Sequence, residues 1–279
     1  MEFTFYTADK IVFKRGALKE AGDYIARLGK KFLVIIDPFF AESPAIEDLT
    51  RQLEALGADY LIFSEVRGEP TVDLVDEVSR LALASQCDAV ISLGGGSCID
   101  VGKATAAIIT NGGPAVDYLE VVGKGKKVTE APVPFVAIPT TAGTGSEVTK
   151  NAVLGSKTQG FKRSMRDDKM VATIAIIDPE LDMGCPRKVT ATSGIDALTH
   201  LIEAYITFRA TPISDGLALK GIELAGKYLQ RACDDGKDME AREGMCAAAL
   251  LGGMALRTRD LARLMDWHGS RHTLPSASW

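Results

Sequence analysis

Several features that would define a different kind of protein are scarce in this sequence. No apolar run approaches the roughly 20 residues that a membrane-spanning helix needs. Lysines and arginines form no cluster and no stripe interleaved with aromatic residues, which argues against a nucleic-acid partner. The N-terminus has no basic segment followed by an apolar one, so we expect no export signal.

Cysteine and histidine are also few. The five cysteines form no Cys-x-x-Cys pair, which is typical of buried thiols in a reducing compartment and not of a disulfide frame or a zinc knot. Of the three histidines, His200, His268 and His272, only the first lies within a regular helical pattern. We therefore expect a cytoplasmic protein with no membrane or nucleic-acid partner.

The pattern that is present alternates strands and helices. The 279 residues, 46% of them hydrophobic, suffice for two domains and a large core. Short apolar runs predict strands at 32–36, 60–63, 89–93, 133–138 and 171–177, and amphipathic segments predict helices at 45–56, 70–86 and 99–110. This alternation predicts a doubly wound parallel sheet.

The character of the chain changes near Cys185. The segments 196–205, 214–230 and 240–256 all have helical periodicity and few strand signals follow. We therefore expect an α/β domain over residues 1–185 and an all-α domain over 186–279.

A glycine-rich loop follows the third predicted strand. Gly94, Gly95, Gly96 and Ser97 allow the backbone to approach a ligand closely, and the N–H groups at the start of the next helix favour a pyrophosphate. A plain strand-to-helix turn would also favour glycine. Asp100, in the first helical turn, belongs to the candidate cofactor site or instead accepts from a loop N–H and fixes the loop.

Two other loops carry candidate cofactor residues. The segment 139–147 is rich in glycine and hydroxyl groups, and its Thr140, Thr141, Thr144 and Ser146 predict the wall of a phosphate or ribose groove, unless the segment is only a solvated turn. Asp37 ends the first strong strand, where an acid often binds ribose hydroxyls and disfavours a 2′-phosphate. Its alternative role is ordinary Asp-Pro turn chemistry.

Asp196 and His200 are the candidate metal ligands. They are four residues apart, which places them one turn apart on the same helix face. A carboxylate and an imidazole so arranged make half of a divalent-metal site. The alternative is an acid favoured by the helix dipole and a histidine packed on the core.

Four motifs in order resemble those of the iron-containing (group III) alcohol dehydrogenases, which include lactaldehyde reductase and 1,3-propanediol dehydrogenase. The motifs are Gly-Gly-Gly-Ser-Cys-Ile-Asp at 94–100, Pro-Thr-Thr-Ala-Gly-Thr-Gly-Ser-Glu at 139–147, Ile-Asp-Pro-Glu-Leu at 177–181 and Gly-Ile-Asp-Ala-Leu-Thr-His at 194–200. The resemblance extends to about Leu256. It implies a dehydroquinate-synthase-like architecture, in which an NAD-binding α/β domain and a helical domain hold a metal between them.

The resemblance also implies roles for individual residues. Asp37 would contact the adenosine ribose, the glycine loop the pyrophosphate, and the three threonines the nucleotide groove. Asn151 and Lys162 fall near positions that the family uses around the nicotinamide. Asp196 and His200 would bind Fe²⁺ or Zn²⁺, and the enzyme would transfer a hydride between a small primary alcohol or diol, or its aldehyde, and NAD. The family also implies a homodimer or a larger homo-oligomer.

The resemblance fails after Leu256. Family members carry two further metal-binding histidines, in segments that resemble Asn-Ala-Gly-Leu-Gly-x-x-His-Gly and Pro-His-Gly, and neither is present here. With suitable codons, a one-nucleotide shift from the last base of the Leu256 codon spells the first of these segments. We hypothesise that residues 257–279 are an aberrant, frameshifted tail, which would leave the helical domain and the metal site incomplete.

Two alternatives to an active alcohol dehydrogenase stay open. One keeps the fold but changes the reaction, as in a dehydroquinate-synthase-like or glycerol-dehydrogenase-like enzyme that also uses NAD and a metal. The other is an inactive, truncated product that binds only nucleotide. Because the metal ligands and part of the helical domain are missing, we expect this chain to be poorly stable or inactive.

Overall fold

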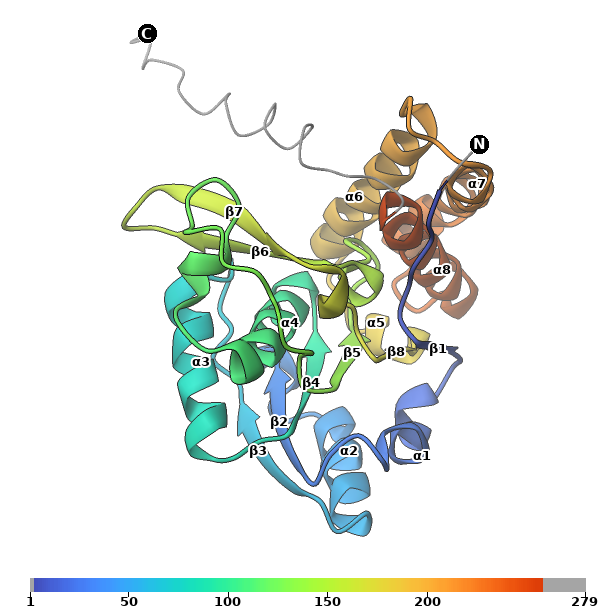
Figure 1. Ribbon diagram of the computed structural model, residues 1–279. Coiled ribbons are helices and arrows are strands. Elements are labelled where there is room, and N and C mark those ends of the chain that lie inside the picture. Colours follow the sequence, from blue (N-terminus) through green and yellow to red (C-terminus); the bar gives the residue numbers. More distant parts are fainter. Residues whose placement is uncertain (1–2, 258–279) are drawn as a thin grey trace, which may run out of the picture.

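The computed structural model describes residues 3–257, with only the backbone of Arg257 included. A parallel six-stranded sheet forms its centre, in the order β1-β8-β5-β4-β2-β3 (Figure 1). The strands are β1 (Lys10–Phe13), β2 (Lys31–Ile36), β3 (Asp59–Phe63), β4 (Ala89–Gly94), β5 (Phe135–Pro139) and β8 (Ile174–Ile177). Strands β4 and β5 are buried along their whole length, which explains why they are nearly continuous apolar runs.

Helices cover both faces of this sheet. On one face α1 (Ala21–Ile25) and α2 (Pro44–Ala55) pack against alternate side chains of β2. On the other face α3 (Val72–Ala84) and α4 (Gly96–Asn111) pack against the remaining ones. The predicted doubly wound α/β fold is confirmed.

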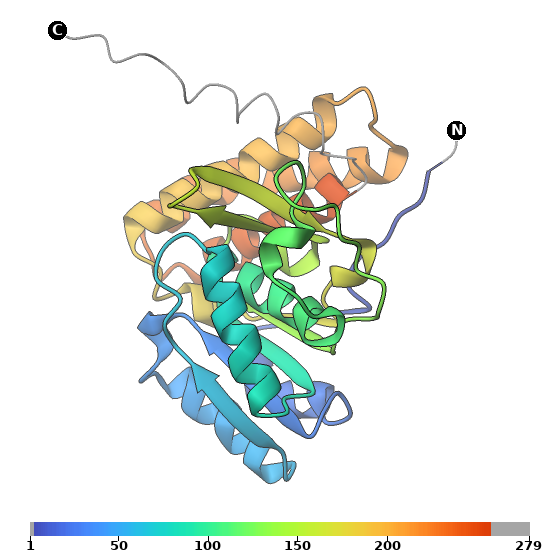
Figure 2. The ribbon, with the colours of Figure 1, turned by 60° about the vertical axis from the view of Figure 1, so that its left-hand side comes forward.

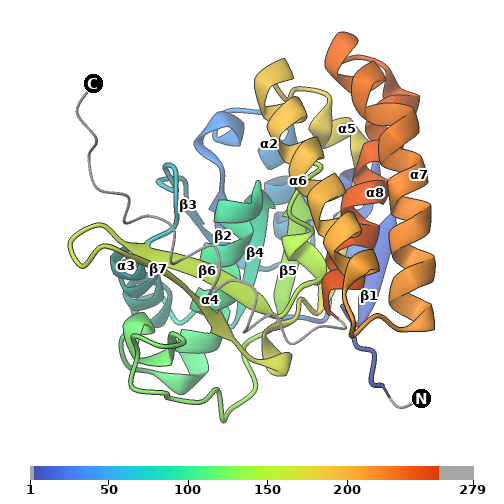
Figure 3. The same cartoon turned by 90° about the horizontal axis from the view of Figure 1, so that it is seen from above.

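Three long helices make up the second part of the described chain. They are α6 (Arg187–Ile206), α7 (Pro212–Asp234) and α8 (Met239–Arg257), which pack on one another beside the sheet (Figures 1 and 3). The predicted helical segments are confirmed, although α6 begins nine residues before the predicted Asp196. A short helix, α5 (Pro179–Asp182), connects the sheet to this bundle.

The sequence pattern missed three strands. Strand β1 is a short, partly exposed edge strand, so its alternation is weak. Strands β6 (Asn151–Ser156) and β7 (Phe161–Arg166) form an antiparallel hairpin whose polar and charged residues mask its strand character. The hairpin packs over α3 and α4 (Figure 2).

Short 3₁₀ helices connect these elements: η1 (Ala17–Glu20), η2 (Pro38–Phe40), η3 (Ala115–Tyr118), η4 (Ser146–Val148) and η5 (Asp168–Met170). Helix α4 begins at Gly96, three residues before the predicted start, so the glycine loop forms its first turn. In residues 3–257 no helix is both long enough and apolar enough to span a bilayer. The hypothesis of a frameshifted tail concerns residues that lie outside the described range, apart from the backbone of Arg257.

Candidate functional site

The topology places two of the predicted loops at the point where the strand order reverses. Strand β2 is followed in the chain by β3, which lies next to it on one side in the sheet. Strand β4 lies on the other side of β2 and is followed in the chain by β5, which lies still further from β2. In open α/β sheets ligands bind at such a switch point, beyond the carboxyl ends of the strands. Asp37 follows β2 and Gly94 ends β4, so both lie at this position.

Two positions of the glycine loop, Gly94 and Gly96, are too tightly packed to accept a side chain. A Cβ atom on Gly94 would lie 2.7 Å from the Cβ of Cys98 and 3.0 Å from that of Asp37. The N-cap residue of α4, Gly95, offers no side-chain cap to the first backbone N–H groups. An anion is a suitable partner for those groups, because they carry the positive end of a 16-residue helix dipole.

The predicted threonine loop, residues 139–147, faces the glycine loop directly. The backbone N–H of Thr140 donates to the carbonyl of Gly94 at 3.1 Å. A Cβ on Gly95 would lie 3.5 Å from Oγ1 of Thr141, and one on Gly96 would lie 2.8 Å from Oγ1 of Thr144. The two segments that the sequence analysis identified separately therefore lie in contact with each other.

Asp37 adopts the turn conformation that was considered as its alternative role. Its Oδ1 accepts from the N–H of Phe39 at 2.9 Å and caps η2. Its backbone N–H donates to Leu93 at 2.9 Å, which holds it beside the glycine loop. The turn contact is compatible with a role at the ribose, because it uses one carboxylate oxygen and the residue is only half-buried.

Asp100 and Ser146 point toward each other and not into the groove. The hydroxyl of Ser146 donates to Oδ1 of Asp100 at 2.5 Å, and the N–H of Val153 donates to Oδ2 at 2.9 Å. Burial raises the pKa of Asp100, against the opposing effects of the nearby Lys103 ammonium and these hydrogen bonds. Asp100 thus fixes a loop, as the sequence suggested, but the loop that it fixes is the threonine loop.

Asn151 and Lys162 lie at different places on the hairpin. Asn151 pairs with Arg166 at the first position of β6, whereas Lys162 pairs with Gly155, four positions further along. That separation is about 13 Å at the usual rise of a strand. The ammonium group of Lys162 is paired with the carboxylate of Glu69.

The metal-ligand candidates lie on α6, which begins beside the threonine loop. A Cβ on Gly143 would be 2.7 Å from the Cβ of Ser193, which lies about one helical turn before Asp196 and about two turns before His200. Asp196 Oδ1 and His200 Nε2 are 3.5 Å apart, with side chains 43% and 23% exposed. Two donors of a tetrahedral ion with bonds of 2.0–2.2 Å are about 3.4 Å apart, so this pair fits a shared divalent cation.

The other ring nitrogen of His200 lacks the partner that is usual for a metal ligand. Its Nδ1 is buried and has no hydrogen-bond partner in the described chain, whereas a metal-binding histidine normally donates its second ring N–H to an acceptor. Within residues 3–257 no group of three or more His, Cys, Asp or Glu side chains lies close enough to hold a metal ion. The described residues therefore supply two donors only.

Apolar side chains are exposed on the same helix and just beyond it. Ile195 is 54% exposed, Ile206 73% and Phe208 90%. These residues flank the candidate metal ligands in sequence.

Two buried contacts that the sequence did not reveal join the threonine loop to α8. Gly145, with φ +63°, meets the backbone of Gly253, and a Cβ added to Gly145 would lie 2.5 Å from the Cα of Gly253. The carboxylate of Asp182 accepts from the N–H of Ala142 and pairs with Arg242 at 3.1 Å. Burial raises the pKa of Asp182 to about 6, although the Arg242 guanidinium opposes this shift.

Arg242 is 1% exposed and has three other acceptors besides Asp182. They are Oγ1 of Thr190 at 2.8 Å and the carbonyls of Gly236 and Cys185 at 3.0 and 3.1 Å. Four hydrogen bonds thus hold the guanidinium of Arg242, a residue of α8, near the start of α6.

Glu147 is a second buried carboxyl group in this region. It lies on η4, which packs against α8, and is 4% exposed. Burial raises its pKa to about 7, more than the Lys103 ammonium and a backbone hydrogen bond lower it.

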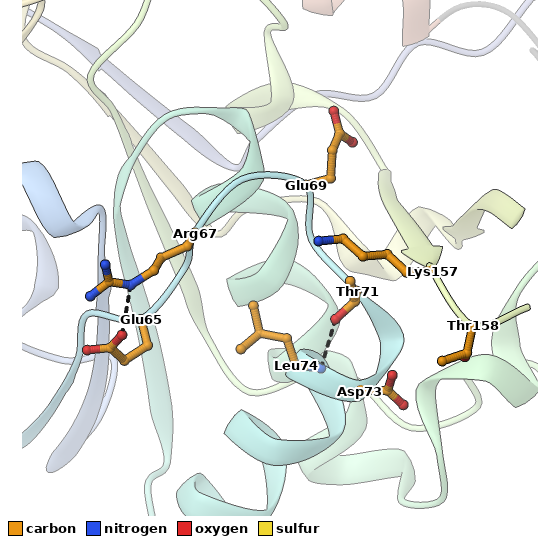
Figure 4. Close-up of a pocket in the computed structure, with 8 residues that line it drawn as sticks. All are labelled: Glu65, Arg67, Glu69, Thr71, Asp73, Leu74, Lys157 and Thr158. Atoms are coloured by element: carbon orange, nitrogen blue, oxygen red, sulfur yellow. Dashed lines mark hydrogen bonds and ion pairs between the residues drawn. The ribbon is translucent and has the colours of Figure 1, made fainter. Parts of the chain in front are cut away.

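A pocket of about 330 Å³ lies apart from these residues, between the loop after β3 and the tip of the β6–β7 hairpin (Figure 4). None of the predicted site residues lines it. Its lining is mixed in charge and consists of Glu65, Arg67, Glu69, Thr71, Asp73, Leu74, Lys157 and Thr158. Within this lining, Arg67 forms an ion pair with Glu65.

The fold and the facing loops define a protein with a nucleotide-binding α/β architecture and a helical second part. Comparison with known proteins agrees with this. The profile of the iron-containing alcohol dehydrogenases matches residues 8–179, and that of the C-terminal part of the Fe-containing alcohol dehydrogenase family matches residues 190–277. The chain belongs to the iron-containing alcohol dehydrogenase family, as its motifs indicated.

Relatives in this family include alcohol dehydrogenase 4 of Schizosaccharomyces pombe, which is 38% identical over 97% of this chain and 63% of its own length. The NAD-dependent methanol dehydrogenase of Bacillus methanolicus is 38% identical over 92% of this chain and 67% of its own. A crystal structure of 1,3-propanediol oxidoreductase superposes with a TM-score of 0.87 at 32% identity, over 92% of this chain and 66% of that one. The chain thus spans about two thirds of the length of these relatives.

Proposed function

We propose that this chain supplies the NAD-binding domain and two metal ligands of an alcohol dehydrogenase. The enzyme would transfer a hydride between a small primary alcohol or diol, or the corresponding aldehyde, and NAD. The observation that carries this proposal is spatial: the glycine and threonine loops face each other at the switch point, and α6 leads from the threonine loop to Asp196 and His200. A relative named as an NAD-dependent methanol dehydrogenase supports the choice of cofactor and substrate class.

The residues of the groove have distinct roles in this proposal. The backbone of the glycine loop, residues 94–97, holds the pyrophosphate at the N-terminus of α4. Thr140, Thr141 and Thr144 line the nucleotide groove, and the carboxylate of Asp37 accepts from the ribose hydroxyls, which favours NAD over NADP. We assign Asn151 and Lys162 to the nicotinamide end, from two positions of the hairpin that are about 13 Å apart.

When bound, NAD accepts the hydride, and a divalent iron or zinc ion acts as a Lewis acid on the substrate oxygen. The chain contributes orientation. The groove fixes the cofactor at the end of the sheet, and α6 places the carboxylate of Asp196 and the imidazole of His200 on one face beside it. Holding the two reacting groups together in this way lowers the entropic part of the barrier.

A second candidate function is nucleotide binding without turnover. It is favoured by the finding that residues 3–257 offer two metal donors and no third. Two protein ligands bind a metal poorly, so we expect weak metal affinity in the chain as given.

We also propose domain boundaries and an oligomeric state. We divide the chain into an NAD-binding domain, residues 1–185, and a partial metal-binding domain, residues 186–279. We propose a cytoplasmic homodimer or larger homo-oligomer, since all five cysteines are free thiols and the family implies self-association.

Separate titrations distinguish the two candidates. NADH is titrated by fluorescence and Fe²⁺ or Zn²⁺ by calorimetry, with Asp196→Ala, His200→Ala and His272→Ala as variants, and NADH oxidation is followed with propionaldehyde or lactaldehyde. Metal binding that is lost in the first two variants and retained in the third supports the dehydrogenase. NADH binding without metal binding or turnover supports the second candidate, and absence of NADH binding refutes both.

A further inference from the structure

Lys103 is a buried cation that the proposed function does not use. It lies on α4 and is 1% exposed. Its ammonium group donates to the carbonyls of Ser146 at 2.7 Å and Asn151 at 2.8 Å, and to the hydroxyls of Ser146 and Thr149 at 3.1 and 3.2 Å. The nearest carboxylate, that of Asp100, is 3.8 Å away.

Stability alone does not explain this arrangement. Removing an ammonium group from water is costly, and an apolar side chain of similar volume often stabilises a protein equally well or better. The four hydrogen bonds described above go to neutral carbonyl and hydroxyl groups, and the carboxylate of Asp100 lies 3.8 Å away. What the four contacts share is their location, because all of them lie on the segment 146–151.

That segment has few hydrogen bonds of its own. It contains the three-residue η4 and then enters β6, the hairpin strand that begins at Asn151. Asp100 lies one turn before Lys103 on α4 and holds the same stretch of chain through Ser146 and Val153. Two charged side chains of one helix therefore take the place of regular secondary structure in fixing this stretch.

We propose that Lys103 is a positioning residue for the cofactor, an inference that rests on the proposed function. Helix α4 begins at the glycine loop, at Gly96, and Lys103 follows seven residues later, about 10 Å along the helix axis. The helix thus sets the distance between the loop that receives the pyrophosphate and the segment that carries the threonine loop into Asn151. Lys103 holds the segment 146–151 at that distance from the glycine loop and does not itself contact the nucleotide.

The test compares Lys103→Met with a control of similar disruption elsewhere. Leu53→Ala removes a fully buried side chain of α2, on the opposite face of the sheet. NADH affinity is measured by the fluorescence of bound NADH, at a temperature where circular dichroism shows every variant folded. We expect the Kd for NADH to rise at least tenfold in Lys103→Met and to stay within twofold of wild type in Leu53→Ala.

Hydrogen exchange supplies a readout that general destabilisation would not reproduce. In Lys103→Met, amides of residues 146–156 should exchange faster while those of β2 keep their protection. The milder Thr149→Val removes one acceptor and should shift the same amides to a smaller extent, which covers the case that Lys103→Met does not fold.

The outcomes separate this inference from the proposed function. An unchanged NADH affinity in Lys103→Met, or a uniform rise in exchange across the sheet, overturns the positioning role. If the wild-type chain does not bind NADH, the proposed function and the cofactor role fail together, whereas a local change in exchange would then show that Lys103 only orders this segment.

Discussion

Removing the guanidinium of Arg242 should destabilise the protein strongly and in a pH-dependent manner. The change Arg242→Met leaves the carboxylate of Asp182 buried without its counter-ion and removes three further hydrogen bonds. Breaking a buried ion pair from one side typically costs about 3–5 kcal/mol. We expect a loss of this size in the free energy of unfolding at pH 8, measured by urea denaturation with circular dichroism.

The sign of the pH dependence follows from Asp182. Its pKa of about 6 in the folded protein is above its ordinary value of 3.8, so its contribution to stability is complete below pH 3.8 and is lost as the pH rises through 6. Without the guanidinium the folded pKa rises further, and the loss continues above pH 6. Arg242→Met should therefore be less destabilised at pH 5, where Asp182 is protonated, than at pH 8.

Two variants make this experiment decisive. Arg231→Met removes a partly exposed arginine of α7 that pairs with Asp238 and Glu240, and exposed pairs of this kind contribute about 0–1 kcal/mol. The double variant Asp182→Asn/Arg242→Met should recover part of the stability at pH 8. If Arg242→Met costs no more than Arg231→Met, or if its cost is the same at pH 5 and pH 8, the reasoning is wrong.

Three further predictions concern the groove and its surroundings. Gly94→Ala should weaken NADH binding at least tenfold, because its Cβ would lie 2.7 Å from that of Cys98, whereas Gly226→Ala, where nothing lies within 4 Å, should leave NADH affinity unchanged. Glu147→Gln should flatten the stability profile between pH 4.5 and 7, since the raised pKa of about 7 makes the wild type lose stability as the pH rises through that range; equal slopes in urea denaturation would contradict this. Asp37→Ser should narrow the preference for NADH over NADPH, and an unchanged ratio of the two dissociation constants would remove Asp37 from the ribose site.

Local sequence patterns predicted most of the fold. Continuous apolar runs identified the buried strands β2, β4, β5 and β8, because strands covered on both faces have no polar side, and a short apolar run also identified the edge strand β3. The same reasoning missed the β6–β7 hairpin, because β6 is short and β7 is rich in charged residues, and β6 packs on α3 and α4. Strand β1 was missed because it pairs only with β8, which is more than 160 residues away.

Those parts of the candidate site whose residues are close together in the sequence could be predicted. Contacts between residues far apart in the sequence could not. The two loops and the pair on α6 could be read from short motifs. The roles of Lys103 and Arg242 could not, because their partners lie far along the chain. One signal was available: Lys103 is the only charged residue between Val101 and Ile109, a run otherwise apolar or small, where a cation must be buried with partners.

The meeting of Gly145 with Gly253 has a consequence for anyone who recombines this protein with its relatives. The threonine loop and α8 touch main chain to main chain, with no side chain between them to adjust the fit. A replacement loop that brings a methyl group or larger to this crossing would wedge the helix away from the sheet and pull α6 with it. Grafts at this position should therefore exchange the loop and the helix as one unit.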